Sequence, residues 1–94
     1  VAKLYAKPNT MSDLKVCVRM FAVARELAGS DEVKLTLPAG ATIGDVRRRL
    51  VEAVPALAPM QAQLMIAMNH DYVSDDALVV ADAELACIPP VSGG

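Results

Sequence analysis

Two early segments of the chain alternate between apolar and polar residues, one over residues 14–21 and the other over residues 32–37. A period of two places every second side chain on the same face, so each segment predicts a strand with one buried face. The inward side chains are Leu14, Val16, Val18 and Met20 in the first strand and Val33, Leu35 and Leu37 in the second. Between them, FAVARELAG at residues 21–29 predicts one or two helical turns that stop at Gly29.

A helical period follows Thr42. Ile43, Val46, Leu50 and Val54 recur at spacings of three, four and four residues and predict one apolar stripe. Thr42 is the expected N-cap, with Asp45 in the reciprocal position of a capping box, and Pro55 should end the helix. Three consecutive arginines on the polar side of this helix could form an anion site, but a solvated face is favoured, because consecutive helical positions point in different directions. Its residues include Arg47, Arg48, Arg49 and Glu52.

The remaining segments are shorter. Residues 55–63 form a connection rich in Pro and Ala, residues 64–68 a third strand, residues 69–71 a turn, residues 72–73 a fourth strand and residues 84–88 a fifth. Pro89 and Pro90 then stop strand pairing, because neither can donate a backbone hydrogen bond. This order predicts an α+β fold of the β-grasp, or ubiquitin-like, arrangement, with a helix across one face of a mixed sheet and strands one and five adjacent.

The 94 residues are enough for one small domain and too few for two. Residues 1–13 have no periodic pattern and are interpreted as an N-terminal extension. Met11 is a candidate native start, with residues 1–10 added upstream; a native arm is the alternative. The domain is expected over residues 14–90, and residues 91–94 are expected to be a flexible C-terminal tail.

Composition argues against several classes of function. The net charge is −2, and Trp is absent beside one Phe and two Tyr, which disfavours nucleic-acid binding. The sequence has no apolar run of roughly 18 residues and no signal peptide pattern, so we expect a cytoplasmic protein that does not enter membranes. Two cysteines and one histidine are too few for a metal site or a cysteine–histidine nucleophile.

The outward side of strands one and five is expected to be apolar. Cys17, Phe21, Ala86 and Ile88 should share it, with Tyr72 as a neighbour, and such a cluster is typical of a partner surface. Arg25 and Glu26 would add charges at its rim, and His70 is expected to be an ordinary surface residue. Cys87 should point into the core with Leu85, away from Cys17, so no disulfide is expected. A sulfur relay at Cys17 is the less favoured alternative.

The last residues carry the candidate chemistry. Pro89 and Pro90 should extend the chain in a polyproline-like form, and Gly93-Gly94 can pass through a channel too narrow for a Cβ atom. A terminal carboxylate at Gly94 is a weak electrophile until it is adenylated. A sulfur donor could then displace AMP and leave a terminal thiocarboxylate.

From about Lys15 to Gly94 the chain resembles the small-subunit family of molybdopterin synthase. The resemblance rests on FAVARELAG at 21–29, AMNHDYVSDD at 67–76 and IPPVSGG at 88–94. It implies that an E1-like enzyme uses ATP to adenylate Gly94, that a sulfurtransferase-type donor supplies sulfur, and that the domain itself binds no cofactor. It also implies sulfur transfer to a cyclic pyranopterin monophosphate within a heterotetramer of small and large subunits, with the catalytic site in the large subunit.

By the same resemblance, the partner-binding residues are expected to be Phe21, Arg25, Tyr72, Ile88, Pro89, Pro90 and Val91. One departure is Ala81-Asp82-Ala83 where the family usually has Asp-Gly-Asp, which predicts a different turn. The alternatives are a sulfur carrier for another pathway such as thiamine thiazole synthesis, a ubiquitin-like protein modifier joined to lysines through Gly94, and a plain interaction module.

Overall fold

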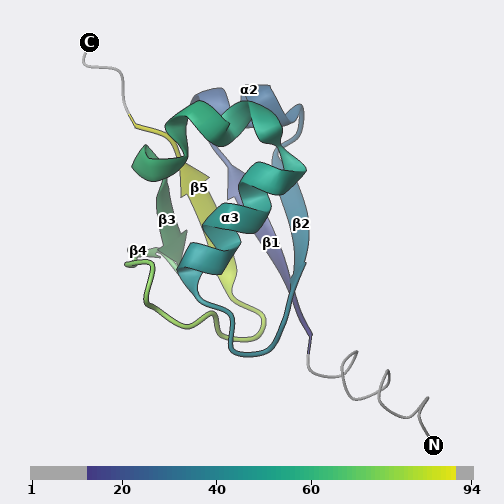
Figure 1. The fold of residues 1–94 in the computed structure, drawn as a ribbon, viewed down its shortest axis with the longest axis vertical. Helices are drawn as coiled ribbons and strands as arrows, with labels where there is room; N and C mark the ends of the chain where they lie inside the picture. Colours follow the sequence, from purple (N-terminus) through teal and green to yellow (C-terminus); the bar gives the residue numbers. More distant parts are fainter. Residues whose placement is uncertain (1–12, 91–94) are drawn as a thin grey trace, which may run out of the picture.

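The computed structural model describes residues 13–90, and Figure 1 shows their arrangement. Its elements are β1 (Leu14–Met20), α2 (Ala22–Ala28), β2 (Glu32–Leu37), α3 (Ile43–Ala53), the 3-10 helix η2 (Pro55–Gln63), β3 (Met65–Met68), β4 (Asp71–Tyr72) and β5 (Glu84–Ile88). Residues 1–12 and 91–94, which include most of the expected extension and the whole expected tail, lie outside the described range. No helix within that range is long and apolar enough to cross a membrane.

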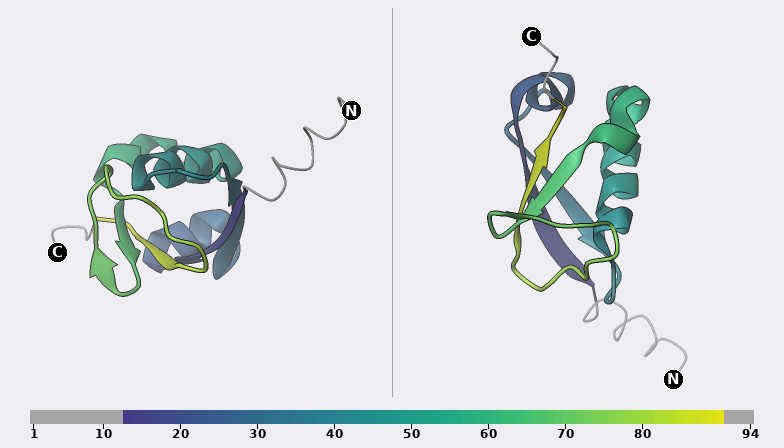
Figure 2. Two further views of the ribbon diagram at one scale, coloured as in Figure 1. Left: turned by 90° about the horizontal axis from the view of Figure 1, so that it is seen from below. Right: turned by 90° about the vertical axis from the view of Figure 1, so that its left-hand side faces the viewer.

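The five strands form one mixed sheet in the order β2-β1-β5-β3-β4. β1 and β5 are parallel neighbours, and the other pairs are antiparallel. Figure 2 shows α3 and η2 on one side of this sheet, whereas α2 lies at the end of the sheet where β5 finishes. The predicted α+β fold of the β-grasp type is therefore confirmed, as is the adjacency of the first and fifth strands.

The core lies between α3 and the inner face of the sheet. The predicted helical stripe is buried, with Ile43, Val46 and Leu50 completely inaccessible to solvent. The capping box is also present: Thr42 N donates to Asp45 Oδ2 at 2.9 Å, and Asp45 N donates to Thr42 Oγ1 at 3.3 Å. These bonds fix the start of α3, because they satisfy amides that have no partner within the helix.

Several predicted boundaries need correction. Residues 55–63 form a 3-10 helix rather than an irregular connection, and its Leu57 is fully buried in the core. The Pro and Ala residues of this segment form no regular apolar pattern, so the sequence did not indicate a helix here. The third strand begins at Met65 rather than Leu64, and the fourth covers Asp71–Tyr72 rather than residues 72–73. The helix after β1 ends, as predicted, at Gly29, which has a φ of 72°.

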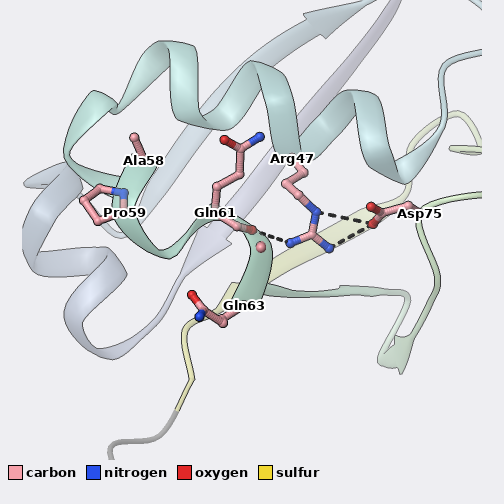
Figure 3. A pocket seen from close by; sticks show the side chains of 7 residues that line it. Arg47, Ala58, Pro59, Gln61, Gln63 and Asp75 are labelled. Atoms are coloured by element: carbon pink, nitrogen blue, oxygen red, sulfur yellow. Dashed lines mark hydrogen bonds and ion pairs between the residues drawn. The ribbon is translucent and has the colours of Figure 1, made fainter.

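The expectation of a solvated arginine face on α3 is wrong for Arg47. Its side chain is only 15% exposed, and its Nη1 donates to Gln61 O at 2.8 Å and to Leu64 O at 2.6 Å. Its Nη2 also reaches Asp75 Oδ1 at 2.9 Å (Figure 3). Arg47 thus joins α3 to the end of η2 and to the loop before β5, whereas Arg48 and Arg49 remain exposed as predicted.

The turn before β5 contains the departure from the family pattern. Asp82 has a φ of 62°, in the left-handed region that glycine adopts most readily. Aspartate tolerates this conformation better than most residues, so the missing glycine does not by itself require a different turn.

Candidate functional site

The outer face of the sheet, opposite α3, is apolar along β5, β3 and β4. Ile88 is paired with Met65, and Ala67 is paired with both Ala86 and Tyr72. Directly paired residues point to the same face, so these side chains form one continuous surface. Tyr72 is 61% exposed and Met65 46% exposed, and contiguous exposed apolar side chains of this kind are typical of an interaction surface. We call the surface formed by Phe21, Met65, Ala67, Tyr72, Ala86 and Ile88 the outer apolar face.

Phe21 joins this face from the end of β1. Its N–H donates to Cys87 O at 3.3 Å, which extends the pairing of β1 with β5 by one residue. Its side chain is 43% exposed and lines a pocket of about 250 Å³ together with Arg19, Ala67, His70, Glu84 and Ala86. The predicted cluster of Phe21, Ala86 and Ile88 with Tyr72 is therefore present on one face. Cys17, on β1, lies on the same side of the sheet as predicted and is partly buried.

Charged groups surround the apolar part of the face. His70 Nε2 lies 3.4 Å from Glu84 Oε1, and the His70 side chain is 83% exposed, as expected of a surface residue. Arg25, on α2, lies 3.7 Å from Asp31 and is also exposed, so its guanidinium remains accessible to a partner. Its predicted contribution to the rim remains a prediction.

The two prolines after β5 differ in their environment. Pro89 is buried and Pro90 is exposed, so only Pro90 presents its ring to a partner in this structure. The prediction that both prolines contact a partner therefore fits Pro90 better than Pro89. Val91, Gly93 and Gly94 lie outside the described residues, so their proposed roles rest on sequence.

Neither cysteine has the environment of a reactive thiol. Both are free, and Cys87 is buried in the core as predicted. Burial raises the pKa of Cys87 to about 11. Partial burial, and after it the neighbouring Glu32, raises the pKa of Cys17. Sulfur relays need an accessible thiolate, so the structure argues against such a role for Cys17. Among residues 13–90, no group of three or more His, Cys, Asp or Glu side chains could hold a metal ion.

A larger pocket, of about 550 Å³, lies beside α3 and η2 (Figure 3). Its charged side chains are Arg47 and Asp75, which already bind each other. Nη1 of Arg47 donates to two backbone carbonyls, so the guanidinium is engaged in the fold and its charge is offset by Asp75. The candidate site is therefore the outer apolar face and not this pocket.

Sequence reasoning missed two features of the outer face. Met65 could have been found from the alternation of residues 64–68, because Leu64 and Ile66 are buried on the other side. The second feature is the backbone of Ala22, directly after Phe21, which has a φ of 53°. Nothing in the residue type of an alanine indicates such a conformation.

Comparison with known proteins agrees with this arrangement. The model of the ThiS family matches residues 18–94, from the middle of β1 to the last residue. The chain belongs to the ThiS family. The match includes β5, both prolines and the Gly-Gly ending.

Individual relatives align over most of the chain. A protein of Arabidopsis thaliana named "Molybdopterin synthase sulfur carrier subunit" is 39% identical over 83 residues, which are 88% of this chain and 86% of that protein. A protein of the same name from Chlamydomonas reinhardtii is 37% identical over 86% of this chain and 100% of its own length. Among solved structures, SAMP1 of Haloferax volcanii has a TM-score of 0.76 and 32% identity, and the match covers 85% of this chain and 99% of SAMP1.

Proposed function

We propose that this chain is the sulfur carrier subunit of a molybdopterin synthase. The observation that carries the proposal is the alignment with relatives of that name over at least 86% of this chain. The outer apolar face supports it, since a carrier that delivers a terminal group must dock on each enzyme that handles this group. The face adjoins the end of β5, the last strand before Pro89 and Pro90.

The reactive group in this proposal is the carboxyl of Gly94. An oxygen of this carboxylate attacks the α-phosphorus of ATP in an E1-like activating enzyme, which forms an acyl adenylate and releases pyrophosphate. A sulfurtransferase-type donor then supplies sulfur at the sulfide oxidation level, with a thiol reductant taking up the second sulfur of any persulfide; this sulfur attacks the acyl carbon, and AMP leaves. The product is a thiocarboxylate. Gly93 contributes by having no side chain, which lets the end of the chain enter a narrow passage.

In the second stage, the thiocarboxylate sulfur bonds to a carbon of a cyclic pyranopterin monophosphate in the large subunit, and water then cleaves the acyl–sulfur bond, which leaves the sulfur on the pterin and returns Gly94 as a carboxylate. Two such donations build a dithiolene. Two small subunits at opposite ends of a large-subunit dimer give the proposed heterotetramer. The carrier provides the sulfur and the docking surface, while the large subunit provides the catalytic groups.

The docking surface in this proposal is the outer apolar face, with Phe21, Tyr72 and Ile88 as large apolar contacts, Arg25 at its rim, and Pro90 and Val91 leading into the large subunit. Ile88→Lys should leave the carrier folded and weaken its binding to the large subunit, because an unpaired charge would be buried against an apolar partner. Thr36→Lys is the matched control, since Thr36 is exposed on β2 of the same sheet face. Titration calorimetry should show a loss only for Ile88→Lys, and equal affinities of the two folded variants would contradict the proposed surface.

The carboxyl itself is tested by changes of chain length. One residue added after Gly94 moves the carboxyl by up to about 3.6 Å, and removal of Gly94 retracts it by as much. Both changes should abolish thiocarboxylate formation or transfer in an assay reconstituted with activating enzyme, sulfur donor and large subunit. Gly94→Ala keeps the length and should impair transfer. Full molybdopterin formation by the extended chain, with its extra residue still present, would end the proposal.

A second candidate function is protein modification. It is favoured by the likeness to SAMP1, which another solved structure names in full as small archaeal modifier protein 1. A modifier would be joined through Gly94 to lysine side chains of other proteins. Mass spectrometry of cell-derived proteins for lysines carrying the C-terminal residues of this chain distinguishes the two functions, because a dedicated sulfur carrier leaves no such adducts.

A further inference from the structure

Ala22 has an unusual backbone for a residue with a side chain. Its φ is 53°, in the left-handed region where the Cβ atom crowds the following carbonyl oxygen. The alanine side chain is exposed, so core packing does not explain why the chain accepts this conformation. Strained backbone of this kind persists only where surrounding contacts hold it in place.

Backbone hydrogen bonds of Phe21, the preceding residue, hold the chain on both sides of this point. Phe21 is extended, with φ −124° and ψ 152°, and its N–H donates to Cys87 O at the end of β5. Its carbonyl oxygen accepts from Ala24 N at 3.1 Å and from Arg25 N at 3.3 Å, in the first turn of α2. Phe21 therefore belongs both to the sheet and to the helix. The chain must change direction within the single residue that follows, and the left-handed backbone of Ala22 makes this change.

The consequence is the placement of the Phe21 side chain. Because Phe21 continues the alternation of β1, its ring follows Cys17 and Arg19 on the outer side of the sheet. There it lines the 250 Å³ pocket with Ala67 and Ala86 while remaining 43% exposed. A right-handed φ at residue 22 would redirect the chain at this point, so the strand bond of Phe21 and the two helix bonds to its carbonyl could not all be kept.

We propose that Ala22 is a positioning residue for partner docking, whose left-handed backbone holds the Phe21 ring on the outer apolar face where the large subunit binds. This inference rests on the proposed function. It predicts that residue 22 acts on binding only through Phe21. Substitutions at this position should therefore be ranked by their tolerance of a left-handed backbone and not by their size or polarity.

The test compares Ala22→Asn with Ala22→Val. The two side chains are similar in size and the site is exposed, but asparagine tolerates positive φ and a β-branched residue does not. Calorimetry with the large subunit should give a Kd for Ala22→Val that is weaker by about tenfold, whereas Ala22→Asn should stay within about twofold of the unaltered chain. Phe21→Ala alone should weaken binding by about tenfold, since aromatic side chains dominate such interfaces.

The deciding measurement is the double variant. In the Phe21→Ala background, Ala22→Val should cause no further loss of affinity, because the ring that it displaces is already absent. A tenfold further loss in the double variant would show that residue 22 acts independently of Phe21 and would overturn the inference, as would equal affinities of the Asn and Val variants. Failure of the unaltered chain to bind any large subunit would overturn the proposed function itself, and this inference with it. Circular dichroism of each variant checks that it is folded. An unfolded Ala22→Val chain beside a folded, tightly binding Ala22→Asn chain would support the requirement for a left-handed backbone at residue 22.

Discussion

Replacement of Arg47 by methionine should destabilise the domain far more than the same change at a neighbouring arginine. Methionine keeps an unbranched apolar stem and a similar helix propensity, so the substitution removes mainly the guanidinium group. Among residues 13–90, the guanidinium is the one side-chain group that connects α3 with both Gln61 O and Leu64 O, at 2.8 and 2.6 Å. Its loss leaves two backbone carbonyls without these donors.

The expected size follows from these contacts. A hydrogen bond to a charged group contributes about 1.5–3 kcal/mol, so two such bonds set an upper range of about 3–6 kcal/mol. Gln61 lines an open pocket of about 550 Å³, where water can replace part of the lost bonding. The bond to Asp75 adds little, because that carboxylate is 54% exposed and exposed ion pairs contribute at most about 1 kcal/mol. The predicted loss for Arg47→Met is therefore about 3 kcal/mol.

Arg49→Met is the matched control, two residues away on the same helix. Arg49 is 46% exposed, and its contacts are long, at 3.3 Å to Thr36 O and 3.9 Å to Glu52. Its loss should lie within about 0.5 kcal/mol. Urea unfolding followed by circular dichroism gives both free energies of unfolding. If Arg47→Met is no less stable than Arg49→Met, with equal slopes in urea, the role of Arg47 as a connector is refuted.

Three further predictions concern single positions. Asp82→Gly should raise the free energy of unfolding by about 0.5–1 kcal/mol, because glycine adopts the φ of 62° without strain; a lower melting temperature would contradict this. The backbone N–H of Thr42 and, after it, Arg48 lower the pKa of Asp45 below its ordinary value of 3.8. The ionised carboxylate therefore stabilises the fold at pH values above 3.8, and this stabilisation is lost as the pH falls through the lowered pKa of the folded state. Asp45→Asn should therefore show a smaller acid-induced loss of stability than the unaltered chain, and parallel pH curves would argue against the capping role. Iodoacetamide at neutral pH should label the partly exposed Cys17 well before Cys87, whose pKa is about 11 in the folded core; equal labelling rates would contradict the burial of Cys87.

The sequence correctly predicted those parts of the fold in which the regular spacing of apolar residues determines the type of element. The bounds of β2 and β5 and the capping box of α3 were all predicted, because alternation and the Thr42–Asp45 spacing depend on local physics. The 3-10 helix was missed because Pro and Ala establish no apolar period. Within that segment Leu57 is fully buried in the core, and Met60 packs against it while partly exposed.

The features that sequence did not predict depend on contacts between residues that are distant in sequence. The arginines of α3 look alike in sequence, and only the folded positions of Gln61 and Leu64 separate Arg47 from its neighbours. Likewise, the left-handed backbone of Ala22 is imposed by the bonds of Phe21 to β5 and α2, which lie far apart in sequence. The outer apolar face was predictable in outline from alternation, whereas the different exposure of Pro89 and Pro90 was not.

The most direct test of the proposed function is the intact mass of the chain after incubation with activating enzyme, ATP and sulfur donor, and again after addition of large subunit and pterin precursor. The proposed function predicts that the mass first rises by the difference between one sulfur and one oxygen atom. Fragmentation should place this change at Gly94, and the mass should return to its starting value as molybdopterin forms. A chain whose mass never changes, or whose sulfur lies on Cys17 instead of Gly94, would contradict the account.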